Sequence, residues 1–110
     1  MLVVETFKAL GDPIRLEMIQ RLSDGSHYTV GGLSDGLGLT RQGARKHLQI
    51  LADVELVSLQ IIGRRTEVSL DPTTLAGVKL FIADLELRWD QRLHALREFV
   101  ENDSPTKSSR

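Results

Sequence analysis

Cysteine is absent from the 110-residue sequence. Its absence excludes disulfide bonds, metal sites built on thiolates and cysteine nucleophiles. Long apolar runs are also missing: no stretch approaches the ~20 residues that span a bilayer, and the N-terminus lacks the basic segment and apolar run of a signal peptide. The remaining composition, with 41% hydrophobic and 26% charged residues, is that of an ordinary globular chain. We therefore expect one cytoplasmic domain.

Net charge is nearly absent as well, at −1, but the charges are unevenly distributed. Residues 41–65 carry five basic and two acidic side chains, whereas residues 1–40 and 66–110 each carry an excess of acidic ones. A basic block inside an otherwise acidic chain indicates a local surface for an anionic partner such as nucleic acid.

Helix-start signals and apolar spacing predict three short helices in the first 40 residues. The first covers about residues 2–10, with an apolar stripe of Val3, Phe7 and Leu10. Asp12 and Pro13 begin the second, because Asp caps free backbone N–H groups and Pro fits the first turn; its apolar residues are Leu16, Ile19 and Leu22. Thr29 caps a third, glycine-rich helix with the apolar residues Val30, Leu33 and Leu37.

A fourth helix is predicted from the cap Thr40 to about Ala52. Its buried side would be Ala44, Leu48 and Leu51, and its outer side would be Arg41, Gln42, Arg45, Lys46 and Gln49. Arg pairs with the O6 and N7 atoms of guanine, and Gln with the N6 and N7 atoms of adenine. The outer side chains are therefore of the types that read base edges in DNA.

The pattern changes to strands after Ala52. Residues 56–62 and 66–70 are rich in β-branched residues and flank the basic connection Gly63-Arg64-Arg65, which predicts a hairpin with a basic tip. Asp71 and Pro72 repeat the helix-start signal, and a long last helix is expected to end near Glu101. Residues 102–110 lack large apolar groups and are expected to form a disordered tail.

The last helix carries more apolar surface than so small a domain can cover alone. Its apolar positions are Val78, Ile82, Leu85, Trp89, Leu93, Leu96 and Val100. We expect this helix to complete part of the core and to make most of a homodimer interface, joined by the first helix. The residues predicted for the interface are Val3, Val4, Phe7, Val78, Ile82, Leu85, Trp89 and Leu93.

The element order α-α-α-α-β-β-α predicts a mainly α fold with a small β-hairpin, a winged helix-turn-helix domain over residues 1–101. In such a domain the fourth helix reads the DNA major groove, and the hairpin tip contacts the minor groove or the flanking backbone. The residues predicted to contact double-stranded DNA are Thr40, Arg41, Gln42, Arg45, Lys46, His47, Gln49, Arg64 and Arg65.

Three segments resemble ArsR-family repressors: residues 10–16, with Leu10-Gly11-Asp12-Pro13; residues 39–51, with the His47-Leu48 pair; and Gly63-Arg64-Arg65. The resemblance extends over about residues 5–101, and the segment from Trp89 to Leu93 is similar to a branch without a recognisable metal site. It implies a homodimeric repressor that binds a roughly palindromic operator and is released by a signal, such as an unidentified small-molecule effector. The family usually has a left-handed glycine where this sequence has Glu55, which should cost stability.

Two other functions stay open at this point. A winged helix can act as a protein-interaction module without specific DNA binding, although such a module does not need the basic residues of the fourth helix. A metal-responsive repressor would use Asp90, His94 and Glu98, spaced four apart on one helix face, but one histidine without a second ligand cluster favours a solvated face. We expect no metal or other cofactor, and no nucleophile motif or phosphate-binding loop indicates an enzyme.

Overall fold

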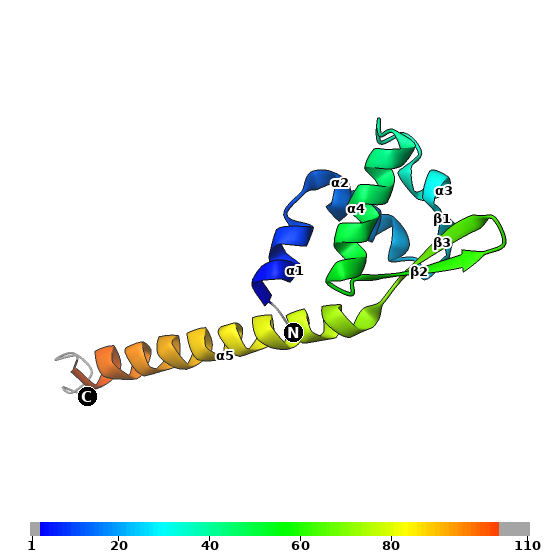
Figure 1. The fold of residues 1–110 in the computed structure, drawn as a ribbon. Helices are drawn as coiled ribbons and strands as arrows, with labels where there is room; N and C mark the ends of the chain where they lie inside the picture. Colours follow the sequence, from blue (N-terminus) through cyan, green and yellow to red (C-terminus); the bar gives the residue numbers. More distant parts are fainter. Residues whose placement is uncertain (1–2, 104–110) are drawn as a thin grey trace. The chain divides into compact units, whose positions relative to one another are not determined.

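The computed structural model describes residues 3–103, which divide into two units between Gly77 and Val78. The predicted fold class is confirmed: the chain is mostly helical, with a small antiparallel sheet (Figure 1). Among the described helices, none is both long and apolar enough to cross a membrane.

The first two helices, α1 (Val3–Leu10) and α2 (Pro13–Leu22), meet at the predicted cap. The Asp12 carboxylate accepts the backbone N–H groups of Ile14 and Arg15, each at 3.0 Å. The buried faces differ from the predicted stripes: α1 buries Thr6 and Ala9, and α2 buries Met18 beside Ile19 and Leu22. Phe7 and Leu16 remain about two-fifths exposed, because α3 and α4 pack on the side of α2 that carries Met18, Ile19 and Leu22.

The third helix is shorter than the sequence predicted. Helix α3 (Val30–Ser34) begins at the cap Thr29, as expected, but ends before Leu37. The chain turns there through Gly36 and Gly38, whose φ angles of 77° and 70° lie in the left-handed region that stops a helix. A two-residue strand, β1 (Tyr28–Thr29), precedes α3 and was not predicted.

Helix α4 (Arg41–Asp53) has its predicted cap, since the Thr40 hydroxyl oxygen accepts the Gly43 N–H at 3.0 Å. A Cβ atom at position 43 would lie 3.2 Å from that same oxygen. The absence of a Cβ atom at Gly43 therefore leaves room for the Thr40 oxygen to accept the capping hydrogen bond. The predicted buried side of the helix, Ala44, Leu48 and Leu51, is confirmed.

The hairpin consists of β2 (Val57–Ile62) and β3 (Arg65–Leu70), paired in register from Val57 with Leu70 to Ile62 with Arg65. Gly63, with a φ of 64°, takes the first position of the two-residue connection, where such tight turns favour glycine. Strand β1 adds to the other edge of β3, so the sheet has the order β1-β3-β2.

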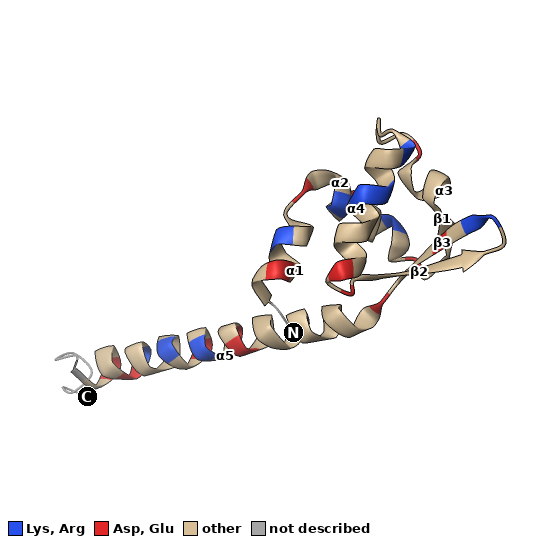
Figure 2. Cartoon of the chain, in the orientation of Figure 1, with Lys and Arg blue, Asp and Glu red and all other residues tan. Residues whose placement is uncertain are grey.

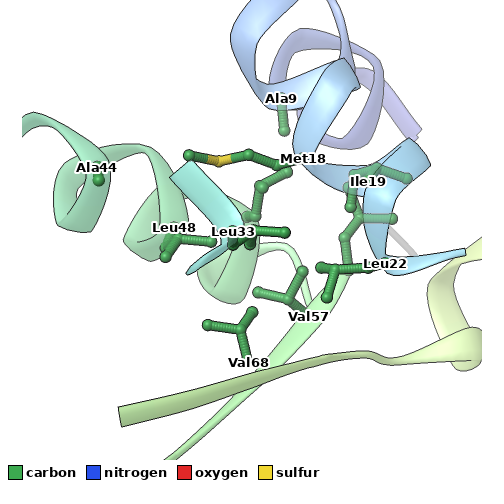
Figure 3. Close-up of a cluster of buried hydrophobic side chains, with 11 residues drawn as sticks. Ala9, Met18, Ile19, Leu22, Leu33, Ala44, Leu48, Val57 and Val68 are labelled. Atoms are coloured by element: carbon green, nitrogen blue, oxygen red, sulfur yellow. The ribbon is translucent and has the colours of Figure 1, made fainter. Parts of the chain in front are cut away.

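The core of the first unit lies where α2, α3 and α4 pack on one another and on the sheet. Figure 3 shows Met18 and Leu22 of α2, Leu33 of α3 and Leu48 of α4 converging above Val68 of β3; all five side chains are at most 1% exposed. The outer face of α4 is therefore fixed by the burial of its inner face.

Helix α5 (Pro72–Asp103) begins at the predicted Asp71–Pro72 signal, with Asp71 Oδ1 accepting the Thr73 N–H at 3.0 Å. Leu75 packs partly against the core, but residues 79–102 are all exposed. The prediction that the last helix completes part of the core is confirmed at its first turn, by Leu75. The helix includes Asn102 and Asp103, which were assigned to the tail; residues 104–110 of that tail lie outside the described residues.

Glu55 occupies the left-handed position expected from the family pattern, with a φ of 59°. For a residue with a Cβ, this left-handed conformation raises the free energy of the folded state by roughly 1–2 kcal/mol relative to glycine. Glycine has more conformational freedom in the unfolded chain, and this offsets about 0.4–1 kcal/mol of that difference. Glu55→Gly should therefore raise the free energy of unfolding by about 1 kcal/mol, and the melting temperature by roughly 4–8 °C, in calorimetry. Glu55→Ala, which removes the carboxylate but keeps the Cβ, should bring no such gain; equal effects would contradict the explanation.

Candidate nucleic-acid interface

The outer face of α4 presents a cluster of polar and basic side chains. Ala44, Leu48 and Leu51 are buried, whereas Arg41, Gln42, Arg45 and Lys46 are all exposed. Thr40 is exposed at the start of the helix; its oxygen accepts the capping bond while its O–H remains a donor. Figure 2 shows basic residues on α4 and at the tip of the β2–β3 hairpin.

An open cavity of about 470 Å³, the basic cavity, lies between α3, the start of α4 and the hairpin. Arginines from two elements line it: Arg41 and Arg45 from α4, and Arg64 and Arg65 from the hairpin. A second, more apolar hollow of about 250 Å³ lies between α4 and the hairpin, where Leu59 and Ile61 meet Arg45 and Gln49. The fold thus brings the two predicted contact elements to one concave surface.

Most of the cations at this surface have no acidic partner. Among the described residues no carboxylate lies within ion-pair distance of Arg41, Arg45, Lys46 or Arg64, whereas Arg65 Nη2 lies 3.1 Å from Glu67 Oε2. Cations that lack a protein counterion and face water are available to an anion such as a DNA phosphate. Arg65 is already partly neutralised, so its contribution to the positive potential is smaller than that of Arg64.

Two predicted contact residues have protein partners instead. His47 is half-buried, and its Nδ1 atom lies 3.1 Å from Nη1 of Arg15 on α2 and 4.0 Å from Oδ2 of Asp12. The Gln49 amide donates to Asp53 Oδ1 at 2.8 Å. His47 therefore faces the junction of α1 and α2, and a base contact by Gln49 would require its bond to Asp53 to break.

The sequence reasoning missed two arginines that hold the helices together. Arg15 donates from Nε to the Ala9 carbonyl at 2.7 Å and so joins α2 to the end of α1. Arg21 donates from Nη1 to the carbonyls of Leu33 and Asp35, at 2.9 and 2.7 Å, and so closes the end of α3. No local signal distinguishes these residues from other arginines on a helix surface, because their partners come from other elements.

The residues predicted for a homodimer interface are mostly exposed in the single chain. Trp89 is 58% and Leu85 49% exposed, Val4 and Phe7 of α1 are exposed too, and Val78 is almost fully buried.

The residues considered as metal ligands lie on the surface of α5. His94 Nε2 lies 3.2 Å from Glu98 Oε2, one helical turn further along, which is the geometry of an ion pair. Within the described part of the chain no three His, Cys, Asp or Glu side chains are grouped closely enough to hold a metal ion.

Comparisons with known proteins agree with this geometry. A family model described as a helix-turn-helix domain matches residues 10–60. Solved structures that match include an ArsR-like transcriptional regulator from Rhodococcus sp. RHA1, with 26% identity, 93% of each chain covered and a TM-score of 0.80. Another ArsR family transcriptional regulator has 25% identity, coverage of 79% of this chain and 89% of its own, and a TM-score of 0.74.

Reduced HlyU from Vibrio cholerae N16961 is 26% identical, covers 74% of this chain and 85% of its own, and has a TM-score of 0.60. No curated protein matches the chain.

The fold and the basic surface define a winged helix-turn-helix DNA-binding protein. With the matched regulators, they support a DNA-binding transcription regulator similar to those of the ArsR family, rather than an enzyme.

The Asp12 cap of α2 should make the stability of the fold depend on pH in the acid range. The Arg15 backbone N–H, aided by the charge of Arg15 and by the Ile14 N–H, holds the pKa of Asp12 below its usual value. A lowered native pKa means that the carboxylate stabilises the fold above the pKa of an unfolded Asp, and that this contribution is lost as pH falls through the native pKa.

Asp12→Asn keeps a capping oxygen but has no charge to lose. In urea unfolding between pH 2 and 6, the stability of the variant should therefore fall less steeply in acid than that of the parent. Parallel curves for the two proteins would show that Asp12 does not contribute to the pH dependence.

Proposed function

We propose that this protein is a homodimeric repressor that binds a palindromic operator through α4 and the β2–β3 hairpin. The convergence of Arg41, Arg45 and Arg64 on the basic cavity, without acidic partners among the described residues, is the observation that carries the proposal. Bound across a promoter, such a dimer blocks transcription by occupancy, as the resemblance to ArsR-family repressors implies. We place this activity in the cytoplasm, with the DNA.

The contacts divide by element. Arg41, Gln42, Arg45 and Lys46 project from one exposed helix face, and we assign base edges and adjoining phosphates to them. Thr40 and Gln49 support them at the two ends of that face, and Arg64, with Arg65, contacts the minor groove or flanking backbone. His47 contributes to DNA binding indirectly, through its contact with Arg15 on α2.

The apolar stripe of α5, which is exposed from Ile82 onward, supports the homodimer. Val78, Trp89 and Val100 are spaced 11 residues apart, and each interval is divided 4, 3, 4 by the other stripe residues, Ile82, Leu85, Leu93 and Leu96. An 11-residue repeat corresponds to about 3.67 residues per turn, close to the helix's own period. The stripe therefore stays on one side of α5 along its whole length, where a second copy can cover it. Val3, Val4 and Phe7 of α1 join this interface in the proposal.

Two half-sites about one helical turn apart would match the two-fold symmetry of such a dimer. The protein-interaction alternative predicts instead that DNA binding is weak and that any DNA competes for it. Release of the repressor by a small-molecule effector is implied by the resemblance to the family alone. We assign none of the described residues to an effector site.

Substitution of the basic side chains should separate specific from general DNA contacts. Arg45→Ala should weaken binding to the operator by about 1–3 kcal/mol while leaving non-specific binding nearly intact, because a base contact is lost. Arg64→Ala should weaken binding to all DNA and reduce the salt slope by about one, because a phosphate contact is lost. Fluorescence anisotropy with duplexes selected from a random pool measures both effects.

Arg88→Ala on α5 removes the same charge from a residue that does not line the basic cavity, and serves as the matched control. If all three variants bind like the parent, the contact assignment is wrong. If the parent itself does not discriminate the selected duplex from competitor DNA, the protein-interaction alternative replaces the proposal.

Trp89 provides a direct test of the dimer, because it is the only tryptophan in the chain and lies in the stripe. Its emission should shift to the blue as concentration rises and the dimer buries it, and light scattering should give twice the 12.3 kDa chain mass. Leu85→Glu, in the stripe, should abolish both effects by placing a charge in the apolar interface. Leu87→Glu, on the opposite side of α5 and 56% exposed, should not; equal behaviour of the two variants would exclude the stripe as the interface.

A further inference from the structure

The Arg15 guanidinium joins three helices. Its Nε atom donates to the Ala9 carbonyl at 2.7 Å and its Nη2 atom to the Lys8 carbonyl at 3.4 Å, both near the C-terminal end of α1. Its Nη1 atom lies 3.1 Å from Nδ1 of His47, in the middle of α4. The carbonyls at a helix end lack partners within their own helix, so a fixed, planar donor such as guanidinium anchors itself on them.

The chemistry of the pair determines the direction of the contact with His47. Arginine is always protonated and can only donate, so the Nδ1 atom of His47 must accept and the ring proton must lie on Nε2. The Asp12 carboxylate accepts the backbone N–H of Arg15 at 3.0 Å and so fixes the backbone from which the Arg15 side chain reaches His47. The side chain of Arg15 is thus held at both ends, by α1 and by α4.

The position of His47 on α4 gives this contact its importance. Ala44, Leu48 and Leu51 settle which face of α4 is buried, but apolar contacts of this kind are non-directional and tolerate sliding and rotation. The Arg15–His47 hydrogen bond is directional. His47 follows the cavity-lining Arg45 by two residues, which turns it about 200° around the helix axis, so the bond lies on the flank of α4 away from the basic cavity. It therefore restrains the rotation and tilt of α4 from the side opposite the hairpin.

We propose that Arg15 is a positioning residue for DNA recognition, which acts through His47 to hold α4 at the angle that base contacts require. This inference rests on the proposed function. Base contacts depend on placement within fractions of an ångström, whereas phosphate contacts tolerate displacement. Loss of the link should consequently lower the ratio of specific to non-specific affinity, and not only affinity overall.

Three substitutions test the link by anisotropy on the selected duplex and on random DNA. Arg15→Lys keeps the charge but loses the planar fork. His47→Gln places its amide near the Nε2 position and leaves Arg15 without an acceptor, whereas His47→Asn places a carbonyl oxygen near the Nδ1 position and keeps one. Arg15→Lys and His47→Gln should each lower the specificity ratio about tenfold, while His47→Asn should stay within about threefold of the parent. Thermal unfolding establishes that each variant is folded at the assay temperature.

The Arg15→Lys/His47→Gln double variant distinguishes a link from two separate effects. If the residues act together, the double variant should lose no more specificity than either single one. Multiplied losses, equal losses on random DNA, or better retention by His47→Gln than by His47→Asn would overturn the inference. A parent protein that does not discriminate the selected duplex would instead contradict the proposed function, so the two failures are distinguishable.

Discussion

The burial of one face of α4 is the constraint on which the rest of the structure depends. Ala44, Leu48 and Leu51 are at most 1% exposed, and they are covered by α2, α3 and the sheet together. A helix with an apolar side of this width must bury it, and burial leaves only one orientation for the charged side. The cations of α4 consequently reach water together, on the same side as the hairpin tip.

Local chemistry made much of this fold predictable. The caps Asp12, Thr29 and Thr40 mark three helix starts, because each places a side-chain oxygen where free backbone N–H groups need an acceptor. The glycine at position 63 marks the hairpin turn for a similar reason. The left-handed backbone at Glu55 was expected from the family pattern alone, since glutamate has no preference for that conformation.

Features that depend on distant partners were not predictable. Strand β1 has only two residues, which pair with Val68 and Glu67 some forty positions further along the chain. The choice of Met18 over Leu16 as a core residue depends on where α3 and α4 lie, because both residues are apolar. The same applies to the candidate site: the residue types on α4 indicated DNA, but the engagement of His47 by Arg15, a residue of another helix, required the folded structure.

The strained backbone at Glu55 also bears on how this chain can evolve. A single base change converts either glutamate codon into a glycine codon, and the side chain is exposed and outside the basic cavity. Natural proteins stay only slightly above the stability that function requires, so changes in base-contacting residues often fail because the fold weakens. Position 55 should therefore act as a general second-site suppressor, at which one common change restores folding and lets the recognition helix explore new operator sequences.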